Sequence, residues 1–546
     1  MSNRQLELAR GYAEAVFRRA REPMGPPGFT PNWADWPSLY KTYPLVPRLP
    51  LPYAPLPTRP VGELDHWPTD EAEYTLETVA SMLRVSYGLL SWRLRVNWNQ
   101  DPGRTQYPRS AWARGTPSGG GLYPLEIYWA TGPAGPLLPG IYHYATGQHS
   151  LVRLLVGDVT DQIRQATGYH ADACATDQFL LVSIAFWRNA FKYGDLCYHL
   201  VTQDLGALLG CWELVARALG APLRRLLWFH DRALDELLGL DTRDESVFAV
   251  VPLPWRDFHH ARQGPEANGQ RGTRRPALER SRKVQRFPRV ERVHLASLVT
   301  DEIRPAPPPT PSVAPGSATA TGPAIPLARP PRLDIGLNAA LMSRRSAFGT
   351  FAARPAVSVD EVGTVLAFAA AGRRYRTDVK PAAGDLPFTR LSIVANRVDG
   401  LAPGGYAYDD RGHVLHPVGP RRPPAAGLSA FLQRHYLLDN YSLDRVGAVV
   451  VVTGRLEEML TAYGNRGYRI LNAEAGAVAQ SGCVAAAAAG VGCGAVLGLD
   501  TLAVDELLGL DGTNERSLLF LLLGSQPTAE ADMDFRLGAP AERGVL

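Results

Sequence analysis

The chain repeats itself, and this repeat limits what it can fold into more than any other feature. Residues 191–200 read FKYGDLCYHL and residues 461–470 read TAYGNRGYRI, so that Tyr193 recurs as Tyr463, 270 positions later. The heptapeptide DELLGLD occurs at 235–241 and again at 505–511, at the same separation. Several matches in the same order indicate two homologous units that fold in the same way.

A third match extends the repeat toward the N-terminus. GIYHY at 140–144 resembles GGYAY at 404–408, at a separation of 264, and a loop insertion accounts for the small change in spacing. The length of 546 residues exceeds what one hydrophobic core usually organises. We therefore expect two domains, a first copy over residues 70–256 and a second copy over residues 333–546.

Within each copy, helical and β patterns follow one another in the same order. An apolar helical run comes first, TLETVASMLRVSYGLL at 75–90 and VDEVGTVLAFAAA at 359–371. A β-run, a hairpin around the GxYxY motif, another β-run, a long helix and a last strand follow. This order predicts an α+β or α/β layered domain. Neither copy has GxGxxG after its first strand, so a dinucleotide-binding Rossmann domain is not supported.

The sequence outside the copies divides into a lead-in segment and a linker. The lead-in, residues 1–69, opens with MSNRQLELARGYAEAVF, which indicates an amphipathic helix and not a secretory signal. The linker, residues 257–332, is arginine-rich at first and then becomes a Pro/Ala/Thr run of extended polyproline character. The basic stretch is more typical of a solvent-exposed face, and binding of an acidic peptide is the alternative interpretation.

Composition and charge exclude several classes of protein. The formal net charge of +4 is too small to indicate nucleic-acid binding without a concentrated patch. Five cysteines without a CxxC pair favour neither a disulfide framework nor a zinc site, so we expect no metal and a cytoplasmic setting. Residues 478–499 carry no charge, but their Ala and Gly content favours a closely packed helix over a membrane span.

A glycine-rich loop marks the first copy. Residues 114–126 read RGTPSGGGLYPLE. Consecutive glycines after Ser118 let the backbone approach a flat ligand, and the loop amides with the Ser118 hydroxyl can donate to the polar edge of that ligand. Taken alone, PSGGG is more often an ordinary surface turn. The second copy has only PAAGDLPF at 381–388, with Ala382 in place of the serine.

The second copy carries a motif that the first copy lacks. Residues 343–351 read SRRSAFGTF and follow the helical run LNAALM. Arg344, Arg345 and Ser346 offer two guanidinium groups and a hydroxyl, which suit bidentate contact with a phosphate. A basic helix terminus in water is the alternative interpretation.

Together these motifs resemble those of a known family. The RRS triplet, the Pro-Ser-Gly loop, LYPLEIY, GIYHY and KYG with its following helix resemble the FMN-dependent nitroreductase superfamily, especially its azoline-oxidising branch, the SagB-type dehydrogenases of ribosomal peptide maturation. The resemblance covers roughly residues 70–256 and 333–527. It implies an α+β fold of two tandem nitroreductase-like domains, each with a mostly antiparallel central sheet flanked by helices, which form a pseudo-dimer within the chain.

The resemblance also implies a flavin site shared by the two copies. Arg344, Arg345 and Ser346 would bind the FMN phosphate, with help from Arg516. The residues implied to lie against the isoalloxazine ring are Pro117, Ser118, Gly119 and Gly120 of the first copy, with Ala495, Val496, Leu497 and Gly498 of the second copy on the other face. Since these motifs survive on different copies, we expect one composite site and a second, decayed one.

A lysine that occurs in one copy only indicates where the chemistry takes place. Lys192 precedes Tyr193, whereas Ala462 precedes Tyr463. The resemblance implies that the Lys192–Tyr193 pair lies beside the flavin and removes a proton from the substrate. An ammonium favours a neighbouring phenolate, but consecutive side chains can diverge, so either residue remains a candidate for the base. A surface lysine before a helix is the alternative. We expect structural roles for two polar residues of the following helix, Tyr198 and Asp204.

Three functions remain open from the sequence. The first is an FMN-dependent dehydrogenase that oxidises thiazolines or oxazolines in a ribosomally made precursor peptide, as in thiopeptide biosynthesis, with a cyclodehydratase as partner. The second is an NAD(P)H-dependent nitro- or quinone reductase, and the third is a flavin-free scaffold that binds the precursor peptide. The fusion and the Lys192–Tyr193 pair favour the first, while the fold alone cannot discriminate. Neither a nucleic acid nor a membrane is expected as a partner.

Overall fold

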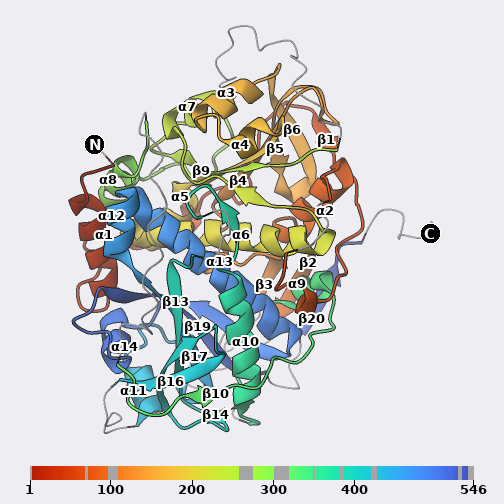
Figure 1. The fold of residues 1–546 in the computed structure, drawn as a ribbon. Helices are drawn as coiled ribbons and strands as arrows, with labels where there is room; N and C mark the ends of the chain where they lie inside the picture. Colours follow the sequence, from red (N-terminus) through yellow and green to blue (C-terminus); the bar gives the residue numbers. More distant parts are fainter. Residues whose placement is uncertain are drawn as a thin grey trace.

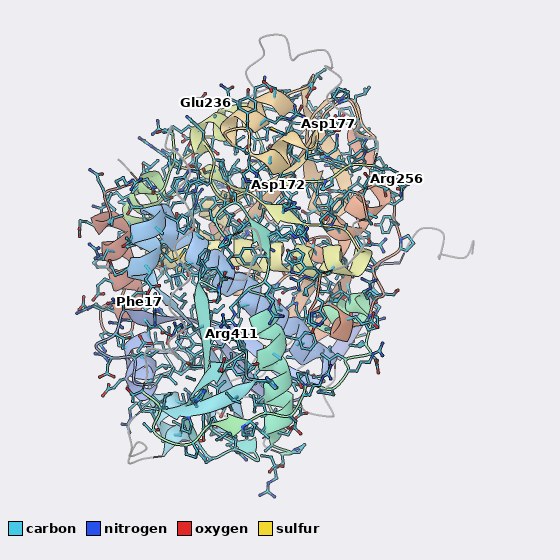
Figure 2. The ribbon with its side chains drawn as sticks, viewed as in Figure 1. Phe17, Asp172, Asp177, Glu236, Arg256 and Arg411 are labelled. Carbon is cyan, nitrogen blue, oxygen red and sulfur yellow. The ribbon has the colours of Figure 1, made fainter. Side chains whose placement is uncertain are left out.

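The computed structural model describes residues 3–67, 72–95, 109–256, 275–300, 319–347, 351–352, 354–381, 386–419, 427–526 and 532–538. The first copy occupies the upper half of the view in Figure 1 and the second copy the lower half, with two long helices between them. Side chains fill the space between these elements (Figure 2).

The first copy is built on a six-stranded sheet. Its strands are β1 (Arg48–Pro50), β4 (Leu125–Thr131), β5 (Gly140–Ala145), β6 (Ser150–Val156), β7 (Gln178–Ala185) and β9 (Glu245–Pro252), in the order β1-β6-β5-β4-β7-β9. Every neighbouring pair is antiparallel. All residues of β4 are buried, as expected for a central strand that is covered on both faces.

The second copy repeats this sheet. Its strands are β10 (Ile325–Pro326), β13 (Thr389–Ala395), β15 (Gly404–Asp409), β16 (Val414–Val418), β17 (Ala448–Arg455), β18 (Val491–Val496) and β19 (Glu515–Ser525), in the order β10-β16-β15-β13-β17-β19-β18. These pairs are also antiparallel. The order β6-β5-β4-β7-β9 of the first copy is thus repeated as β16-β15-β13-β17-β19. The predicted duplication and the α+β fold are confirmed.

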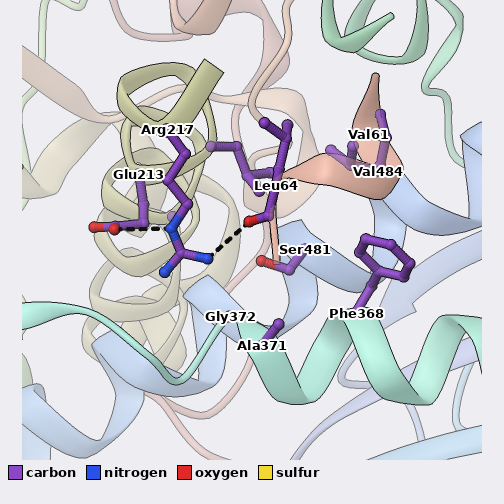
Figure 3. Close-up of a pocket in the computed structure, with 11 residues that line it drawn as sticks. Val61, Leu64, Glu213, Arg217, Phe368, Ala371, Gly372, Ser481 and Val484 are labelled. Atoms are coloured by element: carbon purple, nitrogen blue, oxygen red, sulfur yellow. Dashed lines mark hydrogen bonds and ion pairs between the residues drawn. The ribbon is translucent and has the colours of Figure 1, made fainter. Parts of the chain in front are cut away.

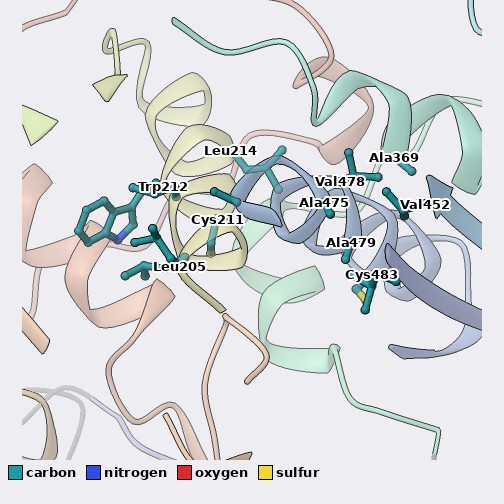
Figure 4. Close-up of a cluster of buried hydrophobic side chains, with 14 of the residues drawn as sticks. Leu205, Cys211, Trp212, Leu214, Ala369, Val452, Ala475, Val478, Ala479 and Cys483 are labelled. Atoms are coloured by element: carbon teal, nitrogen blue, oxygen red, sulfur yellow. The ribbon is translucent and has the colours of Figure 1, made fainter. Parts of the chain in front are cut away.

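Two long buried helices join the copies. They are α6 (Cys197–Leu219) and α13 (Arg466–Ala488), and they pack against each other along the middle of the molecule (Figure 1). A Cβ on Gly206 would lie 1.8 Å from the carbonyl oxygen of Ala473, and one on Gly476 would lie 2.0 Å from that of Gln203. Figure 4 shows the small and apolar side chains that surround this contact. Glycine is required here because the two backbones approach so closely.

The chargeless stretch at 478–499 is only partly helical. Helix α13 ends at Ala488 and β18 begins at Val491, so the stretch turns from a helix into a strand. The predicted packing of helix against helix is confirmed for its first part. In the described ranges, no helix combines the length and the apolar character that crossing a bilayer requires.

Equivalent tyrosines meet at this helix pair. The rings of Tyr198 and Tyr468 stack with their centroids 6.1 Å apart and their planes inclined by 19°. The Tyr468 hydroxyl lies 2.6 Å from His199 Nδ1. This is how two symmetry-related residues contact each other near the axis of a dimer, and it fits the structural role expected for Tyr198.

The remaining helices cover the sheets. They include α2 (Leu76–Ser86), α3 (Thr160–Ala166), α4 (Ala171–Cys174), α5 (Phe186–Tyr193), α7 (Asp231–Leu238), α9 (Leu337–Ser343), α10 (Val359–Ala371), α11 (Leu428–Arg434), α12 (Leu456–Tyr463) and α14 (Thr501–Leu507). The runs predicted as first helices correspond to α2 and α10.

The DELLGLD heptapeptide has the same role in both copies. The buried Asp235 carboxylate accepts hydrogen bonds from the Ser246 hydroxyl and the Val247 amide, each at 2.8 Å, at the start of β9. The Asp505 carboxylate accepts from the hydroxyl and the amide of Ser517 in β19, at 2.5 and 3.0 Å. The repeated aspartate therefore fastens a helix to the last strand of each sheet.

Segments outside the two copies take part in both sheets. The lead-in forms α1 (Glu7–Arg18), which confirms the predicted amphipathic helix, and it also supplies β1. Strand β10 lies within the predicted linker. In addition, β20 (Asp532–Arg536) of the second copy pairs with β2 (Ser91–Arg95) of the first copy, which also pairs with β3 (Arg109–Ala113). Strands from the lead-in, the linker and the second copy thus pair with strands of other predicted segments. The boundaries of these segments stay predictions.

The described part of the arginine-rich stretch packs against the first copy. Helix α8 (Pro288–Ala296) lies against α1, and Ser281 accepts a hydrogen bond from the Trp187 indole at 2.9 Å. Arg286 forms an ion pair with Asp244 at 2.6 Å. At least one arginine thus serves an internal contact, whereas residues 257–274 and 301–318 lie outside the described residues.

Candidate functional site

The Arg344–Ser346 triplet follows α9 and lies against the first copy. The Arg344 guanidinium donates from Nε to the carbonyl oxygen of Gly115 and from Nη2 to that of Arg114, both at 2.9 Å. Ser346 forms a parallel β-bridge with Cys493 of β18. The triplet therefore lies between the start of the glycine loop in the first copy and the strand that leads to residues 495–498 in the second.

Two arginines that sequence reasoning missed complete a basic cluster. Arg93 donates to the carbonyl oxygen of Arg344 and Arg95 donates to that of Ser346, both at 3.0 Å. Both belong to β2, where the alternation of SWRLR places them on one face of the strand. This alternation was the available signal, but the triplet that β2 contacts is about 250 residues away along the chain.

The guanidinium groups in this cluster are close enough to affect one another. Burial lowers the pKa of Arg93, the carboxylate of Asp534 at 3.4 Å opposes this effect, and the charges of Arg344 and Arg345 lower the pKa further. Four arginines thus converge around residues 342–346. This arrangement suits a bound anion such as a phosphate.

The glycine loop faces the Lys192–Tyr193 pair. A Cβ built on Gly120 would lie 2.5 Å from the Tyr193 hydroxyl oxygen and 3.1 Å from Lys192 Nζ. Gly120 also has a φ of 66°, a conformation that favours glycine. Lys192 Nζ lies 5.0 Å from the centre of the Tyr193 ring, and both side chains are half-buried at the end of α5. The structure thus brings the candidate base and the loop together.

The Ser118 hydroxyl is engaged by a carboxylate beneath the loop. It donates to Asp204 Oδ2 at 2.6 Å, while the Gly119 amide donates to Oδ1 at 2.8 Å. In this arrangement an ionised Asp204 takes the hydroxyl hydrogen, and donation from Ser118 to a ligand stays a prediction. Burial raises the pKa of Asp204 to about 7, although both hydrogen bonds oppose the rise.

Residues 495–498 span the end of β18 and the turn that follows. Arg19, at the end of α1, donates hydrogen bonds to the carbonyl oxygens of Leu497 and Leu499. A Cβ on Gly498 would lie 2.7 Å from the ring of Tyr436. The lead-in segment therefore braces the predicted flavin-facing turn, a contact that sequence reasoning also missed.

Arg516 lies far from the triplet, and the prediction that it assists the phosphate is wrong. Cys493, the partner of Ser346, is opposite Leu523 on β19, and Arg516 lies seven residues away along that strand. At the usual rise per residue this is about 20 Å. The Arg516 guanidinium instead donates to carbonyl oxygens of the preceding turn, those of Leu510, Thr513 and Glu515.

The LYPLE and GIYHY motifs meet in a buried polar network. Glu126 of LYPLE accepts from Arg188 of α5 at 2.6 Å and lies 2.7 Å from Nε2 of His143 in GIYHY. Burial alone would raise the pKa of Glu126, but Arg188 and His143 hold this pKa at about 2. Arg188 also donates to the carbonyl oxygen of Tyr123, at 2.8 Å. Because α5 carries Lys192, these motifs position the candidate base.

The corresponding place in the second copy is filled by side chains. Tyr463 is fully buried, and its hydroxyl donates to the carbonyl oxygen of Val379 at 2.5 Å. Its ring lies 6.3 Å from that of Trp228 and 6.1 Å from that of Phe388. Trp228 stands 270 positions before Gly498, so the first copy has an indole where the second copy has a glycine.

The acid beneath the loop also differs between the copies. Glu474 stands 270 positions after Asp204, and its carboxylate is 2.5 Å from Lys380 Nζ, with both side chains fully buried. Glu474 also accepts from the amides of Phe388 and Thr389. Burial lowers the pKa of Lys380 to about 8, against the attraction of Glu474. Ala382, which replaces Ser118, lies outside the described residues.

A separate pocket opens between the lead-in and the helices α6, α10 and α13 (Figure 3). Arg217 lies on one side, where it pairs with Glu213 at 3.2 Å and donates to the carbonyl oxygen of Leu64 at 2.9 Å. Phe368 and Ser481 lie on the other side. Because none of the predicted site residues lines this pocket, it is distinct from the candidate site.

Known proteins share this architecture. Residues 341–525 match the model of the Nitroreductase family. The matched residues lie within the second copy. The crystal structure of a putative nitroreductase from Anabaena variabilis has a TM-score of 0.70 to this chain at 24% identity, and the likeness covers 95% of this chain and 99% of that one. The nitroreductase-like fold therefore extends over both copies.

Two curated relatives match shorter stretches. Putative nitroreductase MJ1384 of Methanocaldococcus jannaschii is 28% identical over 124 residues, which is 23% of this chain and 63% of the relative. The Microcin B17-processing protein McbC of Escherichia coli is 26% identical over 164 residues, which is 28% of this chain and 54% of the relative. The chain thus spans between about half and two thirds of the length of these relatives.

Proposed function

We propose that the protein is an FMN-dependent dehydrogenase that oxidises thiazolines or oxazolines to thiazoles or oxazoles in a ribosomally made peptide. The observation that carries this proposal is the convergence of parts from both copies. Arg344 of the second copy is bound to Gly115 of the first, at the start of the loop that faces Lys192 and Tyr193. The similarity to a protein named for microcin B17 processing supports the peptide substrate.

The residues present fit FMN at both ends of the cofactor. Arg344 and Arg345 would bind its phosphate, because guanidinium groups match phosphate oxygens in charge and geometry. Arg93 and Arg95, which donate to backbone carbonyl oxygens of residues 342–346, would hold this segment in place and add positive charge.

The loop at residues 119–121 would lie against the FMN ring, with Gly121 next to open space. The missing Cβ of Gly120 instead leaves room for the Tyr193 hydroxyl, which brings the candidate base to the loop. Bound FMN would supply the acceptor for a hydride.

Aromatisation of an azoline ring also releases a proton, and we assign the removal of that proton to the Lys192–Tyr193 pair. A carbon-bound proton needs a base whose pKa is suited to the working pH, and an ordinary tyrosine has a pKa near 10. The Lys192 ammonium, 5.0 Å from the Tyr193 ring, favours the phenolate. Either Tyr193 accepts the proton in this form or neutral Lys192 accepts it directly.

We propose one such site in each chain. The position in the second copy that corresponds to the Lys192–Tyr193 pair is filled by the rings of Trp228, Tyr463 and Phe388. In addition, the sequence of the first copy has no counterpart of the RRS triplet to bind a second phosphate. We further infer that the substrate is a precursor peptide already acted on by a cyclodehydratase, because an azoline must be formed before it can be oxidised.

The proposal is tested with the purified full chain. We expect a yellow protein that holds one FMN per chain, measured by absorbance after denaturation, and that removes two hydrogens per ring from a synthetic thiazoline-containing peptide, measured by mass spectrometry. A colourless protein that takes up no added FMN contradicts the cofactor. Two flavins per chain contradict the single site.

A nitro- or quinone reductase is the second candidate, favoured by the family match and by the name of the relative from Methanocaldococcus jannaschii. It predicts NADPH-driven reduction of a nitroarene that does not depend on Lys192. If that activity is found and the thiazoline peptide is left unchanged, the reductase assignment replaces the dehydrogenase.

A further inference from the structure

Ser118 lies at the centre of a short chain of hydrogen bonds beneath the glycine loop. Its oxygen lies 2.6 Å from Asp204 Oδ2 and accepts from the Tyr123 amide at 2.9 Å. The other carboxyl oxygen of Asp204 accepts from the Gly119 amide at 2.8 Å. The positions of the heavy atoms are thus fixed by the backbone, whereas one hydrogen is shared between Ser118 and Asp204.

The direction of this shared hydrogen bond depends on the proton of Asp204. An ionised carboxylate only accepts, so the Ser118 hydroxyl must donate to it. A protonated Asp204 can instead donate to the Ser118 oxygen, whose two lone pairs then serve Asp204 and the Tyr123 amide. The hydroxyl hydrogen of Ser118 is then free to turn toward a ligand on the loop, while the Gly119 amide keeps its acceptor.

We propose that Asp204 is a positioning residue which, in its protonated form, releases the hydroxyl hydrogen of Ser118 to donate to the polar edge of FMN at the glycine loop. This inference rests on the FMN site proposed above. No covalent bond other than the O–H bonds changes. One proton is taken up from solvent by Asp204 when FMN binds to a protein in which Asp204 is ionised.

The surroundings of Asp204 permit this change near neutral pH. Asp204 is 7% exposed on α6, and burial brings its pKa to about 7. Two other titratable groups respond to its charge, Tyr87 at the end of α2 and Cys197 on α6, and burial raises the pKa of both well above their ordinary values. Within the described part of the chain, no lysine or arginine forms an ion pair with Asp204, so the carboxyl group is free to protonate.

The second copy has kept the acid without this arrangement. Glu474, at the position that corresponds to Asp204, is paired with Lys380 and receives two backbone amides. The residue that corresponds to Ser118 is Ala382, which has no hydroxyl to release. The hydrogen bond between a buried aspartate and a serine is thus found in the copy that carries Lys192.

The test compares FMN affinity across pH for three proteins. Flavin fluorescence is titrated from about pH 5.5 to about pH 8.5, on either side of the Asp204 pKa. The wild-type affinity is expected to fall by up to about tenfold per pH unit above the pKa. The Asp204→Asn variant should bind tightly without this fall, because its amide donates to Ser118 while its oxygen accepts from Gly119. The Ser118→Ala variant should bind weakly and also lack the fall.

Calorimetry gives a second readout that a merely structural role would not change. In two buffers of different ionisation enthalpy, FMN binding above neutral pH should take up close to one proton more in the wild type than in Asp204→Asn. The FMN phosphate titrates in the same way in both proteins, so the difference isolates Asp204.

The outcomes separate this inference from the proposed function. Equal pH dependence and equal proton uptake in wild type and Asp204→Asn overturn the role of Asp204 while leaving the FMN site intact. Absence of FMN binding at every pH overturns both. If Asp204→Asn does not fold, the comparison of wild type with Ser118→Ala decides, and equal proton uptake in these two overturns the inference.

Discussion

The two copies share a fold but use equivalent positions in opposite ways. Tyr193 is half-buried beside a glycine loop, whereas Tyr463 is fully buried with its hydroxyl bonded to a backbone carbonyl. Asp204 is hydrogen-bonded to the glycine loop and has no ion-pair partner among the described residues, whereas Glu474 forms an ion pair with Lys380. The difference teaches that a duplicated residue keeps its place in the fold while its neighbours decide whether it serves a site or a core.

One position shows this most directly. The turn after β18 has Gly498, and the corresponding turn of the first copy has Trp228, whose indole packs against Tyr463. In the second copy, the space left by the missing Cβ of Gly498 is taken by the ring of Tyr436, 2.7 Å away, so this turn packs within its own copy. In the first copy, the indole of Trp228 reaches Tyr463 of the other copy. The same turn therefore makes different contacts in the two copies.

The largest effect expected from this comparison is on turnover. Lys192→Ala and Tyr193→Phe should keep FMN but slow azoline oxidation by about 10²–10⁴-fold, the usual contribution of a general base. The matched change in the second copy, Tyr463→Phe, should leave the rate nearly unchanged. Rates are followed by mass spectrometry of the thiazoline peptide. Full activity of Lys192→Ala, or equal damage from Tyr463→Phe, would remove the functional difference between the copies.

The next largest effect is on stability and is expected in the second copy. Glu474→Ala leaves the buried Lys380 without its partner, so the free energy of unfolding should fall by about 3–5 kcal/mol. Asp204→Ala in the first copy leaves a backbone amide without an acceptor and should cost about 1–3 kcal/mol. Urea unfolding measures both. If Asp204→Ala lowers the free energy of unfolding more than Glu474→Ala does, the assignment of Glu474 to the core and of Asp204 to the site is wrong.

A smaller effect separates the two arginines of the triplet. Arg345→Ala should weaken FMN binding by about 1.5–3 kcal/mol, the usual contribution of a charge-assisted hydrogen bond. Arg344→Ala should in addition lower the unfolding temperature, because this side chain donates to two carbonyl oxygens of the first copy. Arg411→Ala, on an exposed turn, is the control. Unchanged FMN affinity in Arg345→Ala argues against a phosphate at the cluster.

The smallest expected effect concerns a single hydroxyl. Tyr463→Phe removes one buried hydrogen bond to Val379 and should lower the free energy of unfolding by about 1 kcal/mol. Tyr193→Phe, at a half-buried position, should change this free energy less. Thermal unfolding of the two variants side by side checks the order, and a reversed order would contradict the burial difference between the copies.

Much of the fold could be predicted from the sequence because the two copies still share recognisable motifs at a nearly constant separation. The succession of helices and strands predicted along each copy is found in both copies, and VDEVGTVLAFAAA coincides with α10. The order of the strands within the sheet was not predicted. The triplet and the glycine loop, predicted to share a site through resemblance, are connected through Arg344. Each of these two parts could be recognised because its residues are contiguous in the sequence.

The remainder depended on contacts between distant segments. Arg93 and Arg95 reach the triplet only because β20 and β3 hold β2 beside it, which no local pattern reveals. Arg516 was misplaced because the resemblance carried no matching motif at this position, and the end of β19 that faces the triplet is set by its pairing with β18. The hydrogen bond between Ser118 and Asp204 joins positions 86 residues apart, and it could not be predicted from the sequence for the same reason.

The pairing of β20 with β2 also determines how the arginine cluster assembles. Strands from both copies hold the cluster, yet both belong to one chain, so their encounter is intramolecular and its effective concentration is fixed by the covalent connection. A site built from the same parts on two separate subunits would come apart on dilution. In this chain, dilution leaves the parts together, and loading with a ligand then depends on the concentration of that ligand and not on that of the protein.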